Sequence, residues 1–194
     1  MVIIAARPPP EACPVGSVSV SSTYYKIIPL KGAQLNRFIT NDFVEKRTCD
    51  VNTDYVLSLT APANTIYPAS PDIGPHFRLA PDIESVFSGN QIKILIEARS
   101  TGSSDERAFE LNYFSGPKGA SGWQRYELLP TYSQFVFDYT VPKASQEQGV
   151  DYLAIRPVAG ASAEQVEIRD ITFLTLSLMN GTERRKALAD HVDP

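Results

Sequence analysis

The stretch from Gln91 to Ser100, QIKILIEARS, constrains the fold of this 194-residue chain more than any other. Its even-numbered positions from 92 to 98 are apolar, and charged residues stand between them, with Leu95 as the one exception. Successive side chains of a β-strand point to opposite faces. The pattern therefore predicts a strand with one buried face and one mostly charged face.

Further stretches show the same alternation of apolar and polar residues, and turn-forming residues separate them. They are Tyr55–Thr60, Ala108–Phe114, Trp123–Leu129, Phe135–Val141, Asp151–Pro157 and Gln165–Ser177, with weaker edge candidates at Ser17–Ser22 and Tyr24–Leu30. Short strands, frequent turns and little helix are typical of an all-β sandwich or barrel. We expect Gln91–Ser100 and Ala108–Phe114 to form a hairpin, and the proline-rich stretch Ala61–Pro81 to be a long ordered loop.

The domain boundaries follow from composition. Residues 1–16 are expected to be a linker or N-terminal extension, residues 17–180 the β-sandwich, and residues 181–194 a C-terminal tail that is a short helix or frayed. The start lacks a basic leader before a long apolar region, so we expect no signal peptide. The localisation stays open between the cytoplasm and a segment of a longer protein.

Bulk properties argue against several partners. The net charge of −4 and the scattered Lys and Arg residues do not favour nucleic acid. No apolar run reaches the roughly 20 residues of a membrane helix. Cys13 and Cys49 allow one disulfide or two separate thiols, and His76 and His191 are too far apart in sequence for a His-rich metal site.

The order of landmarks from residue 91 to residue 176 resembles the jelly-roll carbohydrate-binding modules of the galactose-binding-like fold. The matching segments read IKILIEARS, FELNYF, SGWQRYEL, FVFDYTVP, DYLAIRPV and VEIRDITFLTL. The resemblance implies an antiparallel jelly roll, lectin-like glycan binding on a sheet face or at end loops, and in many members a structural calcium near the terminal strands. The resemblance makes Asp170 one candidate calcium ligand, and the alternative is that Asp170 pairs with Arg169 or with a turn amide.

Strand parity predicts a polar outer face. If the strands are neighbours, one face carries residues suited to sugar hydroxyls and to stacking on a pyranose ring. The expected glycan-binding residues are Glu97, Arg99, Asn112, Trp123, Arg125, Tyr152 and Arg156, with Asp138 on the same face. The alternative is a solvated sheet face with cross-strand ion pairs, and Trp123 capping the core.

Three functions remain open from the sequence. The first is a non-catalytic carbohydrate-binding module, free-standing or attached to other domains. The second is a structural or protein-interaction module that uses an exposed strand edge or the loop Ala61–Pro81. The third is a glycoside hydrolase with a carboxylate pair drawn from Glu97, Glu110, Glu127 and Asp138. The hydrolase is disfavoured because an arginine is expected near each of these carboxylates, and an ion-paired carboxylate is a poor general acid.

Overall fold

The computed structural model describes residues 26–47, 56–102, 106–143, 149–158, 160 and 162–192. Cys13, Cys49 and the expected edge strand Ser17–Ser22 lie outside the described residues. Within the described ranges, no helix is both long and apolar enough to cross a membrane.

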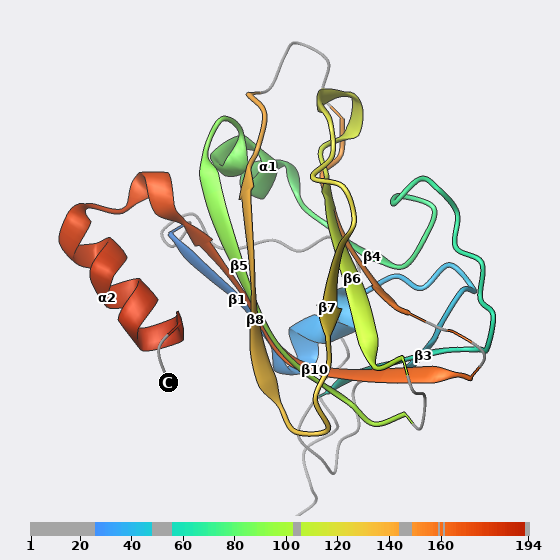
Figure 1. The fold of residues 1–194 in the computed structure, drawn as a ribbon. Helices are drawn as coiled ribbons and strands as arrows, with labels where there is room; N and C mark the ends of the chain where they lie inside the picture. Colours follow the sequence, from blue (N-terminus) through green and yellow to red (C-terminus); the bar gives the residue numbers. More distant parts are fainter. Residues whose placement is uncertain are drawn as a thin grey trace, which may run out of the picture.

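The larger of two antiparallel sheets has six strands (Figure 1). Its strands are β1 (Ile27–Lys31), β2 (Glu45–Arg47), β3 (Leu57–Ala61), β5 (Gln91–Ser100), β8 (Ser133–Thr140) and β10 (Glu164–Thr175). The order is β2-β3-β10-β5-β8, and β1 pairs with the second half of β10. The 12-residue β10 therefore contacts β5 on one side and both β1 and β3 on the other.

The smaller sheet has four strands in the order β4-β9-β6-β7 and faces the larger sheet (Figure 1). The strands are β4 (His76–Arg78), β6 (Ala108–Phe114), β7 (Gln124–Glu127) and β9 (Tyr152–Pro157). Short 3₁₀ turns and two helices complete the fold, namely η1 (Gly32–Arg37), α1 (Pro81–Phe87), η2 (Gly116–Lys118), η3 (Leu176–Leu178) and α2 (Gly181–Val192). The predicted all-β sandwich with antiparallel sheets is confirmed.

The core lies between the two sheets, and the predicted parity of β5 is correct. Ile92, Ile94 and Ile96 are fully buried and belong to the same cluster as Phe109 and Leu111 of β6. Apolar burial on this scale is the main source of stability for a domain of this size. The alternation in the sequence thus fixes which side chains of each strand face inward.

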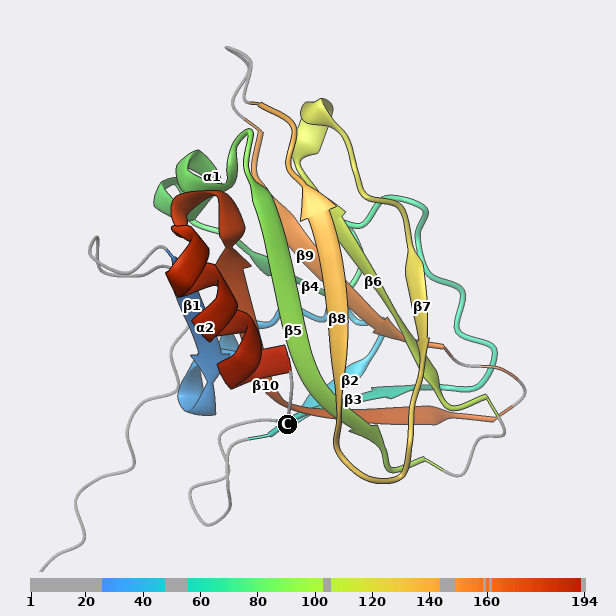
Figure 2. The same cartoon turned by 60° about the vertical axis from the view of Figure 1, so that its left-hand side comes forward.

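The structure explains why the apolar Leu95 occupies an outward position of β5 and breaks the alternation. It points away from the main core, yet only 3% of its surface is exposed. A second apolar cluster on the outer face of the larger sheet contains Leu95, Leu174 and Met179 together with Ala187 of α2. Helix α2 therefore packs against the outer face of the six-stranded sheet, as Figure 2 shows.

Two predicted local features need correction, and one helix was not predicted. The expected hairpin of Gln91–Ser100 with Ala108–Phe114 is wrong, because β5 and β6 belong to different sheets and their connection crosses the sandwich. The loop Ala61–Pro81 is interrupted by β4, which pairs with β9. Helix α1 was not anticipated, although Pro81 at its first turn, followed by acidic residues, is a common helix start.

Candidate functional site

The structure distributes the predicted glycan-binding residues over two faces, so the prediction of one shared face is wrong. Glu97, Arg99 and Asp138 belong to β5 and β8 of the six-stranded sheet. The others lie on or beside the four-stranded sheet, namely Asn112, Trp123, Arg125, Tyr152 and Arg156. Parity determines whether a side chain points inward or outward, but it does not determine the sheet to which the strand belongs.

Arg156 is at the centre of the cluster on the four-stranded sheet. Its Nε donates to Oε2 of Glu110 at 2.7 Å, and the two residues are directly opposite each other on β9 and β6. Only 17% and 23% of these two side chains are exposed. A charge-assisted pair in this setting holds the guanidinium group in one orientation.

Two aromatic rings flank this guanidinium group. Its Cζ lies 3.7 Å from the centroid of the Trp123 ring and 5.0 Å from that of Tyr67. Such cation–π contacts contribute about 0.5–2 kcal/mol each, more where water is excluded. Trp123 is half-buried on the outer face and is not part of the main core cluster. The alternative in which Trp123 caps the core is therefore wrong.

Tyr67 reaches the cluster from the loop between β3 and β4. Its hydroxyl donates to the carbonyl of Pro157 at 2.9 Å, which fixes the ring beside Arg156. Burial raises the pKa of the Tyr67 hydroxyl far above its usual range, so it stays a hydrogen-bond donor. Sequence parity missed Tyr67 as a site residue because it lies outside any strand.

The remaining predicted residues of this sheet differ in accessibility. Arg125 lies opposite Glu110 in register and pairs with Glu127 at 2.8 Å, and both Arg125 and Glu127 are exposed. Tyr152 stacks edge-on against His76, with ring centroids 4.8 Å apart. Asn112 is 3% exposed and accepts a hydrogen bond from Ser121 at 3.2 Å. The expectation that Asn112 is accessible to a ligand is wrong, because the turn before β7 brings Ser121 against Asn112.

Glu97 and Arg99 take part in a separate cluster on the six-stranded sheet. Arg99 pairs with Glu167 at 2.6 Å, and its Cζ lies 4.6 Å from the centroid of Tyr132. Arg169 contacts the same ring at 4.3 Å and pairs with Glu97. The pairing register of β10 with β5 shifts between Ile168 and Asp170, and Arg169 lies at this irregularity.

All four carboxylates considered for glycoside hydrolysis lie in ion pairs. Glu97, Glu110 and Glu127 pair with arginines, and Asp138 pairs with Lys93 at 2.7 Å. Each of these carboxylates is therefore already engaged by a cation of this chain, whereas glycoside hydrolysis needs a pair that faces the glycosidic bond. These residues give no support to a hydrolase.

Asp170, the candidate calcium ligand, lies on β10, and calcium takes six to eight oxygen ligands. Asp170 Oδ1 accepts a hydrogen bond from the Thr172 hydroxyl at 2.8 Å. Its neighbours in register are Lys31 of β1 and Glu97 of β5, and Glu97 pairs with Arg169. Among the described residues no group of three or more His, Cys, Asp and Glu side chains is placed to hold a metal ion.

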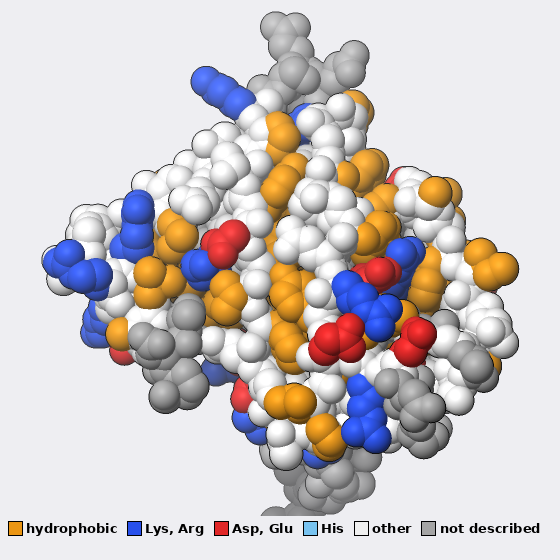
Figure 3. All heavy atoms as spheres, viewed as in Figure 1, with side chains coloured by type: hydrophobic (Ala, Val, Ile, Leu, Met, Phe, Trp, Pro, Cys, Tyr) orange, Lys and Arg blue, Asp and Glu red, His pale blue; other side chains and the backbone are white. Residues whose placement is uncertain are grey.

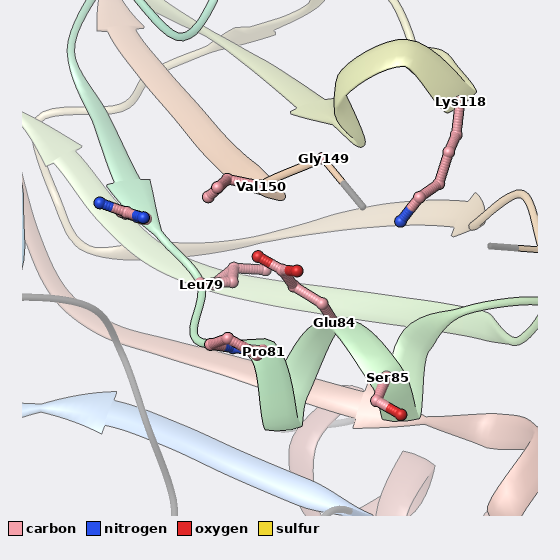
Figure 4. Close-up of a pocket in the computed structure, with 8 residues that line it drawn as sticks. Leu79, Pro81, Glu84, Ser85, Lys118, Gly149 and Val150 are labelled. Atoms are coloured by element: carbon pink, nitrogen blue, oxygen red, sulfur yellow. The ribbon is translucent and has the colours of Figure 1, made fainter. Parts of the chain in front are cut away.

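A cavity of about 300 Å³ lies at one end of the sandwich, between α1 and the η2 turn (Figure 4). Glu84 and Lys118 extend into the same region from these two elements. Asp151 follows the lining residue Val150 in the chain. It is fully buried, accepts a hydrogen bond from the Tyr113 hydroxyl at 2.7 Å, and has the Nζ of the lining residue Lys118 3.7 Å from its Oδ1. Burial raises the pKa of both Glu84 and Asp151.

No family model and no curated protein matches the sequence. Among solved structures, the CBM22-2 xylan-binding domain of Paenibacillus barcinonensis Xyn10C superposes with a TM-score of 0.50 at 9% identity, covering 71% of this chain and 91% of that one. A CBM4 structure gives a TM-score of 0.47 at 16% identity, covering 76% and 94%. The C-terminal CBM6 of LamC from Zobellia galactanivorans gives 0.39 at 11%, covering 76% and 98%.

At these identities the likeness is one of fold. The chain has the β-sandwich fold found in carbohydrate-binding modules, which confirms the resemblance in fold stated from the sequence.

Proposed function

We propose that this chain is a non-catalytic carbohydrate-binding module that binds a glycan on the outer face of its four-stranded sheet. The observation that carries the proposal is the arrangement of Trp123, Arg156 and Tyr67, with Arg156 held by Glu110. Similarity of fold to a xylan-binding domain supports the proposal but does not identify a ligand.

The chemistry of this face suits a sugar. An indole ring offers an apolar surface for the C–H face of a pyranose, and Arg and Glu side chains offer donors and acceptors for adjacent hydroxyls. Arg156 and Glu110 hold each other in place before a ligand arrives, so less side-chain entropy is lost on binding. Exposed Arg125 on β7 and half-buried Tyr152 on β9 belong to the same sheet.

The face of the six-stranded sheet provides a matched control. Arg99 has the same types of contact as Arg156, namely one carboxylate partner and a neighbouring aromatic ring. Arg156→Ala and Arg99→Ala therefore remove the same chemistry from opposite faces of the molecule. Charge-assisted hydrogen bonds are worth about 1.5–3 kcal/mol, so the loss of one to a ligand weakens binding tenfold or more.

The test is a glycan array with the native protein, followed by calorimetric titration of its best ligand. Trp123→Ala and Arg156→Ala should raise Kd at least tenfold, whereas Arg99→Ala and Tyr132→Ala should leave it within about twofold. Melting temperatures of all four variants establish that they are folded. Absence of any glycan binding by the native protein, or equal losses on both faces, would refute the proposal.

A further inference from the structure

The cavity at the end of the sandwich is lined by two cations whose hydrogen-bond donors are not used within the described part of the chain. Lys118 is one of them, and only 7% of its side chain is exposed. Its Nζ lies 3.7 Å from Asp151 Oδ1, which is too long for a hydrogen bond. The other is the exposed Arg78, which no hydrogen bond or ion pair joins to another described residue. Such groups bind anionic oxygens most strongly, so the cavity favours a ligand with a negative charge.

Arg78 differs in this respect from the other arginines of the four-stranded sheet. Arg156 pairs with Glu110. Arg125 on β7 pairs with Glu127. Figure 3 shows basic and acidic side chains next to one another on the side of the molecule where β7 lies. Most of the positive charge on this sheet is thus balanced within the chain, whereas the charge of Arg78 is available to a ligand.

The strand register places the cavity beside the proposed glycan site. Arg78 of β4 lies directly opposite Tyr152 of β9. Both side chains point outward, because the adjacent residues Phe77 and Leu153 belong to the core. Arg156 lies four residues further along β9, which is about 13 Å at about 3.3 Å per residue. A short oligosaccharide bound beside Arg156 can therefore reach the cavity.

Tyr152 offers an aromatic surface between these two ends. Phe114 lies opposite it on β6, and the two ring centroids are 6.1 Å apart at an interplanar angle of 25°. His76 contacts the Tyr152 ring edge-on. Both Phe114 and Tyr152 are half-buried, so part of each ring is open to a ligand. Rings held in this way suit the C–H groups of a sugar.

We propose that the cavity between α1 and η2 binds the carboxylate of a hexuronic acid, and that the chain therefore prefers acidic glycans to neutral ones. The inference rests on the proposed glycan-binding function and names the class of glycan. The planar fork of Arg78 suits the two oxygens of a carboxylate, and Lys118 adds a point charge. The volume of about 300 Å³ is at the lower end of the range for ligand sites, so the cavity fits one sugar residue.

Glu84 makes this site dependent on pH. It is the only carboxylate among the described lining residues, and its Oε1 accepts the Asp151 N–H at 3.0 Å. The charged groups that face it are Arg78 on β4, Lys118 on η2 and Asp151 before β9, and burial is the main cause of its raised pKa. As the pH falls through the raised pKa, Glu84 gains a proton and no longer repels a carboxylate. Binding of an acidic glycan should therefore strengthen as the pH falls.

The test uses the full chain and pairs of oligosaccharides that differ in one group. Each hexuronate-containing glycan that binds on an array is compared, by calorimetric titration, with the same glycan after reduction of its carboxyl group to an alcohol. Reduction should raise Kd of the native protein about tenfold or more. Arg78→Ala should bind the two forms within about twofold of each other. Arg185→Ala, which removes an exposed arginine of α2, should keep the native difference.

The pH dependence provides a second readout. Between neutral pH and about pH 5, Kd of the native protein for the acidic form should fall, whereas Kd for the reduced form should stay constant. Glu84→Gln should bind the acidic form more tightly at neutral pH and should lose the dependence on pH. A dependence that is the same in folded Glu84→Gln would overturn the inference, because another group would then control binding.

The outcomes separate this inference from the proposed function. A native protein that binds neutral and reduced glycans as tightly as acidic ones would overturn the inference and leave the proposed function standing. A native protein that binds no glycan refutes the proposed function, and free D-glucuronate then tests the cavity alone. Saturable shifts of amide resonances in the segments 78–85 and 116–118, lost in Arg78→Ala, would support a site for a free sugar acid. Their absence would overturn the inference as well.

Discussion

Leu95→Ala tests whether α2 really covers the outer face of the six-stranded sheet. Leu95 is 3% exposed although it points away from the main core. The substitution removes three carbon groups, and at about 0.8 kcal/mol for each buried group the transfer cost is about 2.4 kcal/mol. The second cluster is small and α2 can settle into the space, so the added cavity cost is modest. We expect a total of about 2.5–3 kcal/mol, near the lower end of the usual 2–5.

Urea unfolding at equilibrium measures this cost as a shift of the midpoint at constant m value. Glu97→Ala is the control, since Glu97 lies on the same face of β5 in a partly exposed ion pair with Arg169. Its cost should stay below about 1 kcal/mol. If Leu95→Ala costs no more than Glu97→Ala, the helix does not cover this face in solution.

A double-mutant cycle identifies α2 as the cause. Ala187→Glu places a charge where 5% of the native side chain is exposed, and this should detach the helix from the sheet. Once the helix is detached, Leu95 is already solvated and its truncation becomes cheap. The combined cost of the two substitutions should therefore fall short of the sum by 1 kcal/mol or more. Strict additivity would refute the reasoning.

Two further predictions concern ionisable groups. Burial raises the pKa of Glu84 above 4.5 in the folded state, so the contribution of Glu84 to stability is complete below that pH and is lost as the pH rises through the raised value. Glu84→Gln, which keeps an acceptor for the Asp151 N–H, should therefore become more stable relative to the native protein over that pH range in urea titrations. A difference in stability that does not depend on pH would contradict this. If Asp170 helps to hold a structural calcium ion, millimolar calcium should raise the melting temperature and Asp170→Asn should abolish the rise; a melting temperature that calcium leaves unchanged would remove calcium from the account.

The sequence predicts the sandwich well because burial imposes a period of two on every strand. The same period applies to both sheets, so it cannot show that β5 and β6 lie in different layers. That information resides in the connection 101–107, whose polar residues fit a hairpin as well as a crossover. Leu95 was a usable signal, since an apolar side chain on a polar face implies a cover, and here the cover is α2.

The candidate site was predicted only in part for a similar reason. Trp123, Arg125, Tyr152 and Arg156 were found because they belong to one sheet and alternate outward. Tyr67 lies in a loop, where no periodicity indicates its direction. The burial of Asn112 depends on Ser121, whose position is set by a turn rather than by a strand.

The position of β10 in the six-stranded sheet determines when the domain can fold. β10 lies between β5 on one side and the strands β1 and β3 on the other. In the register of β1 with β10, Lys31 lies opposite Asp170, which is near the other end of the chain. During synthesis these earlier strands leave the ribosome long before their common partner exists. Contacts between residues so distant in sequence slow folding. We therefore expect the sheet to assemble only after nearly the whole domain has emerged. Chains that stop before β10 should expose to chaperones and proteases the edges of β1, β3 and β5 that β10 covers.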